Sequence, residues 1–350
     1  MEALNRKMLV LARESRGLTQ SALAEAAEIR QSSISRFENG TIMPDDETLR
    51  RLADSLDYPV SFFFQTDDVY GLTSGCLYYR KFKRMPVGEL KRIHAIINIL
   101  RMQVARILSE VEIESDNGFP QLDISRFKYD TDAIARLARA SWGMPLGPVE
   151  NLVDFVEAAG GIVIPVSFGS QSIDAISQWT PMLPPLFFIN RDRPGDRIRW
   201  TLSHEIGHVL MHRMPSENQE QEADLFASEF LLPTEAIENE FPANVTLQSL
   251  IPLKARWKVS LQALIMKAKR LQVISERKAQ QLFMAISKHG WRKAEPVIIP
   301  RESPTVVDKS VQAILLSSTL EALAQRLNAK PYAVAQLLMA SEGPRLRVVK

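Results

Sequence analysis

The residues best suited to do chemistry form a His-Glu-Ile-Gly-His segment at positions 204–208. In a helix, residues four positions apart lie on one face, so the imidazoles of His204 and His208 can reach a single metal ion. Glu205 would then face a metal-bound water as a general base, which is the chemistry of zinc-dependent peptide hydrolysis. The alternative is that both histidines are ordinary core residues. The flanks favour the metal site, because a helix buried by its apolar residues needs a reason to carry these three side chains. The apolar flanking residues are Trp200, Leu202, Ile206, Val209 and Leu210.

A catalytic zinc site needs a third protein ligand, and the next helical segment offers several acids. Glu220 is predicted to be that ligand. Asp224, four positions on and on the same face, is predicted to accept a hydrogen bond from a ligand histidine. Glu222 is the competitor, but it lies about 200° round the helix from Glu220, so only one of the two can face the metal. The other acids are interpreted as exposed surface carboxylates.

His212 continues the four-residue spacing beyond His208. It is predicted to end the helix or to pack locally, one turn beyond the metal. Met214 stands where a metzincin would place a third histidine, so the pattern does not predict that arrangement. The predicted cofactor is Zn²⁺, with another divalent ion such as Mn²⁺ as an alternative.

Helices and a small sheet are predicted to position these residues. The candidate ligands lie on helices at 198–212 and 218–232. Three strand-like runs come before them, at 161–166, 173–179 and 186–189. The predicted fold class is therefore mainly α with a small β-sheet (α+β). Further helices are predicted at 87–114, 132–142, 149–159, 247–257, 261–271, 276–288 and 311–339.

The N-terminal segment, residues 4–64, carries the pattern of a helix-turn-helix. Thr19 is a typical N-cap for the first helix of the helix-turn-helix pair, and Gly40 is a typical C-terminal residue for the second helix. The outward face of the second helix carries polar residues suited to base edges and phosphates, namely Gln31, Ser32, Ser33 and Arg36.

Charge is unevenly distributed along the chain. Residues 1–63 contain ten acids against eight Lys and Arg, so DNA binding would depend on the local placement of the arginines. An alternative is that the helix-turn-helix makes protein contacts only. Residues 80–106 hold eight Lys and Arg against one acid, and residues 254–293 hold eleven against one. These segments either attract phosphates or an acidic partner, or are solvated faces of amphipathic helices.

Length and composition indicate a cytoplasmic protein of several domains. A chain of 350 residues exceeds one average domain, and no apolar run approaches the ~18 residues that would span a membrane. Cys76 is the only cysteine, which excludes an internal disulfide. The predicted division is a helix-turn-helix domain (1–66), a linker with a long helix (67–118), a zincin-like domain (119–240), its helical tail (241–293), and a linker with a C-terminal helical segment (294–350).

The N-terminal segment resembles the lambda-repressor-like (XRE/Cro) helix-turn-helix family. The resemblance lies in Leu18–Ala24, in Gln31–Gly40 and in the apolar pattern around Leu49 and Leu52. It implies a DNA operator as partner, a phosphate contact by Gln20, and base contacts by Gln31, Ser32 and Arg36. A homodimer is expected, because proteins of this type read paired half-sites.

Residues from about 132 to 271 resemble the ImmA/IrrE family of metallopeptidases. The resemblance rests on the runs Arg199–His212 and Glu220–Pro233, with support from 186–190 and 256–264. It implies a zincin-like domain with a three-stranded sheet beside the active-site helix, and an extended substrate that adds to the outermost strand. It also implies that His204, His208 and Glu220 hold the metal. The implied substrate is a repressor or other regulatory protein, encoded nearby and cut in a stress- or phage-related response.

Two alternatives remain open at this point. The zincin-like domain could sense or bind a partner without proteolysis, in a transcription regulator. The chain could also be the antitoxin or regulator half of a toxin–antitoxin pair. Residues 320–338 have a spacing that suits a second helix-turn-helix, but an ordinary helix pair fits equally well, so only helices are predicted there.

Overall fold

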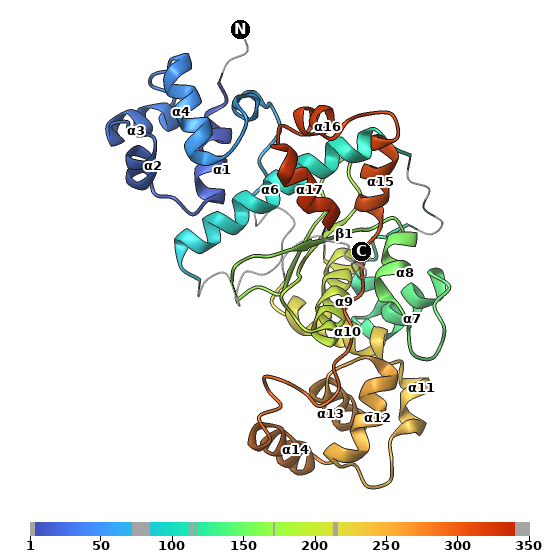
Figure 1. The fold of residues 1–350 in the computed structure, drawn as a ribbon. Coiled ribbons are helices and arrows are strands. Elements are labelled where there is room, and N and C mark those ends of the chain that lie inside the picture. Colours follow the sequence, from blue (N-terminus) through green and yellow to red (C-terminus); the bar gives the residue numbers. More distant parts are fainter. Residues whose placement is uncertain are drawn as a thin grey trace, which may run out of the picture. The chain divides into compact units, whose positions relative to one another are not determined.

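The computed structural model describes residues 4–71, 85–112, 115, 118–170, 172–212 and 216–339, with side chains up to residue 335. The chain divides into two compact units, one of residues 1–113 and 305–350 and the other of residues 114–304. Helices dominate both, and the described residues form one sheet of three strands (Figure 1). The predicted fold class, mainly α with a small β-sheet, is confirmed. Cys76 and the basic residues at 80–84 lie outside the described residues.

The first unit begins with a bundle of four short helices. Thr19 accepts a hydrogen bond from the Ala22 N–H at 3.1 Å and so caps the second helix, while Gly40 ends the third with a φ of 73°. Leu23, Ile34 and Leu52 are fully buried between the helices. The elements are α1 (Arg6–Ser15), α2 (Gln20–Ala26), α3 (Gln31–Asn39), α4 (Asp46–Leu56) and the 3-10 helix η1 (Val60–Phe64).

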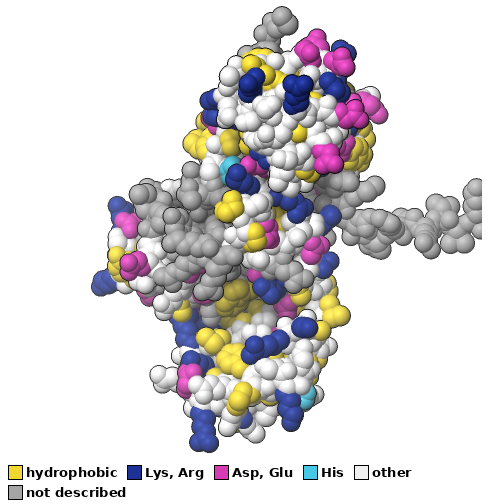
Figure 2. All heavy atoms as spheres, turned by 90° about the vertical axis from the view of Figure 1, so that its left-hand side faces the viewer, with side chains coloured by type: hydrophobic (Ala, Val, Ile, Leu, Met, Phe, Trp, Pro, Cys, Tyr) yellow, Lys and Arg dark blue, Asp and Glu magenta, His cyan; other side chains and the backbone are white. Residues whose placement is uncertain are grey.

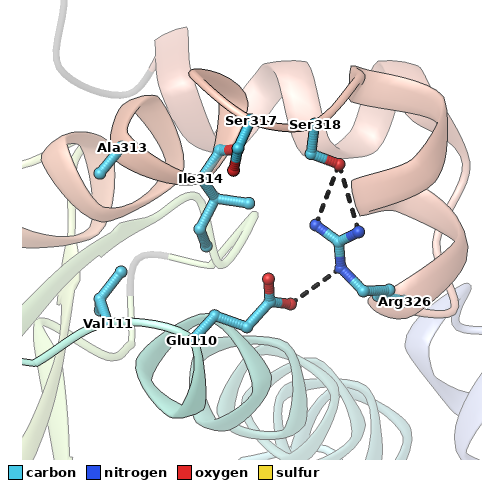
Figure 3. Close-up of a pocket in the computed structure, with 7 residues that line it drawn as sticks. All are labelled: Glu110, Val111, Ala313, Ile314, Ser317, Ser318 and Arg326. Atoms are coloured by element: carbon cyan, nitrogen blue, oxygen red, sulfur yellow. Dashed lines mark hydrogen bonds and ion pairs between the residues drawn. The ribbon is translucent and has the colours of Figure 1, made fainter.

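A long helix, α6 (Val87–Ser109), and three C-terminal helices complete this unit. The C-terminal helices are α15 (Val306–Leu315), α16 (Leu320–Arg326) and α17 (Pro331–Met339). Ile107 of α6 is buried with Val311, Leu323 and Val334 in one apolar cluster. Beside it, Arg326 bridges Glu110 at 2.9 Å and Ser318 at 3.2 Å (Figure 3).

Helices α15 to α17 have the same lengths and the same spacing along the chain as α1 to α3. Their bounds are 306–315, 320–326 and 331–339, against 6–15, 20–26 and 31–39. The turns match as well. Thr319 caps α16 as Thr19 caps α2, at 3.2 and 3.1 Å. Asn328 and Glu28 both adopt a positive φ, 49° and 53°. The C-terminal segment is therefore a second helix-turn-helix in geometry, where only helices were predicted.

The second copy lacks the polar side chains of the first. Leu320, Pro331 and Tyr332 stand at the positions of Gln20, Gln31 and Ser32. The Tyr332 hydroxyl donates to Asp57, and the Lys330 Nζ lies 2.9 Å from the same carboxylate. The start of this helix is thus used for contacts within the chain.

The second unit contains the sheet. Its strand order is β1-β3-β2, with β1 parallel and β2 antiparallel to the central β3. All five residues of β3 are buried, which fits a strand covered on both faces. The elements are η2 (Ile124–Phe127), α7 (Thr131–Ser141), α8 (Leu152–Ala158), β1 (Ile162–Val166), β2 (Ala175–Gln178), β3 (Leu186–Asn190), α9 (Gly195–Met211) and α10 (Gln219–Leu231).

Five further short elements extend the core of this unit. Trp257 and Leu264 from these helices are buried in the same apolar cluster as Leu202 of α9 and Phe230 of α10. Helix α9 therefore lies at the centre, with α10 and the sheet against it (Figure 1). The added elements are α11 (Thr234–Ile237), η3 (Glu238–Glu240), α12 (Leu247–Trp257), α13 (Leu261–Arg270) and α14 (Glu276–Lys288).

Two lysines of the basic segment 254–293 do not face solvent. Lys254 is fully buried and pairs with Asp196 and Glu295. Lys267 is fully buried and lies 2.6 Å from the buried Glu229. For these two residues, neither interpretation of the basic segment is correct, because their ammonium groups form ion pairs inside the fold. They neither face solvent nor remain available to bind a phosphate.

Residues 294–304, which belong to the proline-rich linker predicted at 294–308, make specific contacts within the second unit. The Glu302 carboxylate accepts from the N–H groups of Leu152 and Val153 at 2.8 and 2.9 Å, and it also pairs with Arg199 of α9. Gly195 lies so close to the carbonyls at 299 and 300 that a Cβ would collide with them. This segment therefore fixes the beginning of α9.

No described helix is both long and apolar enough to cross a membrane.

Candidate metal centre and helix-turn-helix

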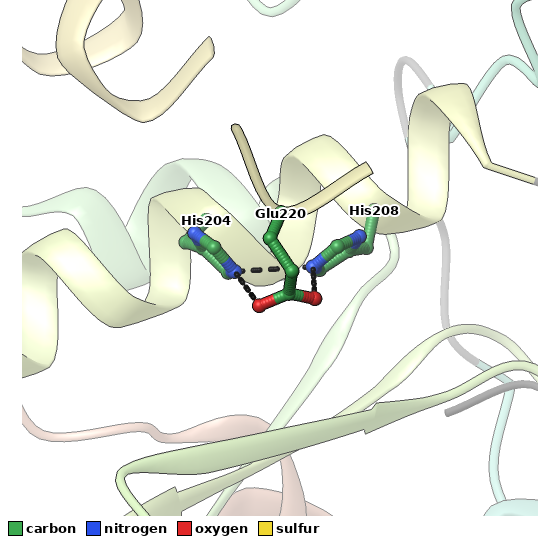
Figure 4. A group of neighbouring side chains, drawn as sticks. All are labelled: His204, His208 and Glu220. Atoms are coloured by element: carbon green, nitrogen blue, oxygen red, sulfur yellow. Dashed lines mark hydrogen bonds and ion pairs between the residues drawn. The ribbon is translucent and has the colours of Figure 1, made fainter. Parts of the chain in front are cut away.

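Three candidate ligands come together between α9 and α10. His204 and His208 project from the same face of α9, and their Nε2 atoms lie 3.0 Å apart. Glu220, in the first turn of α10, places its carboxylate oxygens 3.9 Å from His204 Nε2 and 3.5 Å from His208 Nε2 (Figure 4). Both imidazoles are at least nine-tenths buried. Two nitrogens and a carboxylate converging in this way form a donor set for one divalent cation.

Glu222, the competitor of Glu220, points elsewhere. Its Oε2 lies 3.0 Å from His212 Nε2, and burial raises the pKa of its carboxyl. The helical offset between the two glutamates thus separates them as expected. Asp224 lies 2.8 Å from His204 Nδ1, which holds that ring with Nε2 directed at Glu220.

His212 was predicted to end the helix or to pack locally, and the structure shows both. It caps α9, and its Nδ1 lies 2.9 Å from His208 Nδ1. Burial, together with the nearby His208 and His204, lowers the pKa of His212 to about 3, so its ring is neutral at neutral pH. Glu222, His212 and His208 therefore form one chain of hydrogen bonds. The four-residue spacing of the three histidines was the available signal.

Glu205 is 1% exposed and faces β2. Its Oε2 accepts two hydrogen bonds from Ser177, from the backbone N–H at 3.0 Å and from the hydroxyl at 2.6 Å. Its Oε1 is buried and has no hydrogen-bond partner among the described residues. Ser177 was not predicted, because nothing in the sequence connects a strand serine to a helix residue far along the chain.

Comparison with known families agrees with this geometry. Residues 156–269 match the family model described as the IrrE N-terminal-like domain of the M78 peptidases, and residues 9–63 match a helix-turn-helix model. The chain therefore contains an ImmA/IrrE-type domain and an N-terminal helix-turn-helix domain. The matched ImmA/IrrE region includes the whole sheet and the three candidate ligands, so it is a domain of a metallopeptidase family. No curated protein matches the chain.

The helix-turn-helix domain exposes three of the four residues predicted to contact DNA. Gln31, Ser32 and Arg36 are exposed on α3. Gln20 is half-buried on α2 and accepts a hydrogen bond from the Gln31 amide at 3.1 Å. The structure therefore brings Gln20 and Gln31 together across the turn.

The buried ion pair of Arg13 and Glu38 holds Gln20 in place beside Gln31. The Gln20 amide donates to Glu38 at 2.8 Å, and Arg13 holds the same carboxylate through two contacts of 2.5 and 3.0 Å. Such support orders long polar side chains before any DNA arrives. Figure 2 shows basic and acidic side chains side by side on the face of this domain, as expected from its nearly balanced charge.

Proposed function

We propose that this chain is a zinc-dependent endopeptidase that is directed by its helix-turn-helix domain to DNA or to DNA-bound regulators. The supporting observation is the convergence of His204, His208 and Glu220 next to the buried Glu205. Two imidazoles and one carboxylate are the protein ligands of one class of catalytic zinc sites, which leave a fourth position for water. Zn²⁺ is the proposed ion, and Mn²⁺ is the alternative.

A zinc ion in this site would polarise the scissile carbonyl and lower the pKa of a bound water towards neutrality. The residues of the chain then have separate tasks. Glu205 accepts the proton of the attacking water on Oε1 and passes it to the leaving amine. Asp224 and His212 hold His204 and His208 through their Nδ1 atoms, so that both present Nε2.

The proposed substrate is a protein, and a repressor encoded nearby is the first candidate. Gln20, Gln31, Ser32 and Arg36 would place the peptidase at an operator, where such a repressor is found. A homodimer is proposed for this purpose, because helix-turn-helix proteins read paired half-sites.

The test compares the full-length chain with its Glu205→Gln variant. Metal content is measured on both proteins, and each is then incubated with the repressor encoded beside its gene. One zinc per chain in both proteins, with cleavage only by the unchanged chain, is the expected result. Zinc in both proteins without any cleavage favours a regulator, and absence of zinc from both removes the peptidase proposal. The surface variant Glu217→Gln is the matched control and should behave as the unchanged chain.

A further inference from the structure

Ser177 and Glu205 form a buried contact between the sheet and the active-site helix. Ser177 is 4% exposed and Glu205 is 1% exposed. Both hydrogen bonds from Ser177 end on the same oxygen, Oε2, at 3.0 Å from the backbone nitrogen and 2.6 Å from the hydroxyl. A buried carboxylate needs donors to replace water, and here one residue supplies two of them.

The position of β2 in the sheet makes this contact possible. Strand β2 pairs with β3 through Ser177 and Phe187, and it has no second neighbour among the described strands. The N–H of Ser177 is therefore directed across the other side of β2, towards α9. A serine at this place can use its backbone and its hydroxyl together.

The contact leaves the two oxygens of Glu205 in different situations. Oε2 is held by two donors, whereas Oε1 is buried and accepts no hydrogen bond from the described residues. A free glutamate rotates about three side-chain bonds, and fixing one oxygen twice removes most of that freedom. Oε1 is then the oxygen kept available to accept a proton.

We propose that Ser177 is a positioning residue that orients the general base Glu205, so that Oε1 faces the bound water or a molecule in its place. This inference rests on the proposed peptidase function. It assigns to the edge strand β2 a task in catalysis besides any contact with an extended substrate.

The experiment uses the full-length zinc-loaded chain and acetohydroxamic acid as probe. This small molecule binds zinc through two oxygens. It also carries an N–H and an acidic O–H, and a correctly placed carboxylate can accept a hydrogen bond or a proton from them. Its Kd is measured by calorimetry for the unchanged chain and for the Ser177→Ala, Ser177→Thr and Glu205→Gln variants. Zinc affinity is measured separately by competition with a chelating dye.

We expect Ser177→Ala to weaken acetohydroxamate binding about tenfold, the scale of one hydrogen bond to a charged group. Zinc affinity should stay unchanged, and Ser177→Thr, which keeps the hydroxyl, should restore probe binding. In the Glu205→Gln background, Ser177→Ala should add no further loss, because both act through one carboxylate. The control is Ser167→Ala, which removes a hydroxyl 2.7 Å from Asp192 outside the site and should leave both affinities unchanged.

Two results would overturn the inference alone: unchanged probe affinity in Ser177→Ala, or an effect that adds to that of Glu205→Gln. A chain that binds no zinc would overturn the proposed function, and with it the role of Ser177. Should Ser177→Ala fail to fold, Ser177→Cys replaces it, because a thiol is nearly the same size and a weaker donor. Probe binding must then be weaker with Cys than with Ser or Thr, and equal binding by all three would contradict the role.

Discussion

The Nδ1 atoms of His208 and His212 lie 2.9 Å apart. Only one proton fits between them, so one ring donates and the other accepts. If His208 Nε2 binds a metal, its proton lies on Nδ1 and is donated to His212. The proton of the neutral His212 then lies on Nε2, where Glu222 accepts it at 3.0 Å. Metal binding would thus select one proton arrangement along the whole chain.

The first prediction concerns this chain of hydrogen bonds. His212→Phe keeps a ring of similar size but leaves the buried His208 N–H without its acceptor. We expect zinc affinity to fall roughly 10- to 100-fold, the usual effect of losing an outer partner of a metal ligand. Competition with a chelating dye measures it. His289→Phe, the same change at an exposed histidine, is the control, and equal affinities of the two variants would contradict the prediction.

The second prediction concerns DNA recognition by α3. Replacing the exposed Arg36 with alanine removes a guanidinium that can reach base edges. We expect a loss of about 1–3 kcal/mol in operator binding and a smaller loss on unrelated DNA. Fluorescence anisotropy at fixed salt compares the two. Arg50→Ala on α4, outside the helix-turn-helix pair, is the control. A larger effect of Arg50→Ala than of Arg36→Ala would assign recognition to another surface.

The third prediction concerns the buried ion pair between α10 and α13. Glu229 and Lys267 are both fully buried, and Lys267→Met removes this buried cation and leaves the carboxylate with the half-exposed Arg136 at 3.4 Å. Burial raises the pKa of Glu229, but the bonds from Lys267 and Thr234 outweigh it and hold that pKa below the usual value. We expect the free energy of unfolding to fall by about 3–5 kcal/mol, measured by urea titration.

Helix α13 also provides the control for this pair. Lys269 contacts Glu276, and both side chains are more than a third exposed. Lys269→Met should change stability by less than about 1 kcal/mol, because water screens the pair. If both lysine variants lost equal stability, burial would not be the cause.

The fourth prediction concerns the segment that packs on the beginning of α9. A methyl group at Gly195 would collide with the backbone carbonyls at 299 and 300, which have little room to move. We expect Gly195→Ala to destabilise the second unit by about 1–3 kcal/mol in thermal unfolding. Gly147→Ala, where a Cβ meets nothing within 4 Å, should be close to neutral. Equal melting temperatures for the two variants would contradict the prediction, because they would show that the backbone at 299 and 300 can move to admit the methyl group.

The sequence by itself determined the features that repeat along one helix or one turn. The spacing of His204 and His208, the opposite directions of Glu220 and Glu222, and the caps at Thr19 and Gly40 follow from local backbone geometry. A helix has a fixed rotation per residue, so relations within a few turns can be read without knowing the rest of the fold.

Only the tertiary structure decided the contacts between distant segments. Ser177 reaches Glu205 because β2 lies at an edge of the sheet against α9, and Glu302 holds α9 because segment 294–304 folds back onto it. Lys254 and Lys267 belong to a basic segment in the sequence but lie inside ion pairs in the fold. These partners depend on how whole elements pack, and packing is set by the shape and burial of the entire core, which local spacing does not encode.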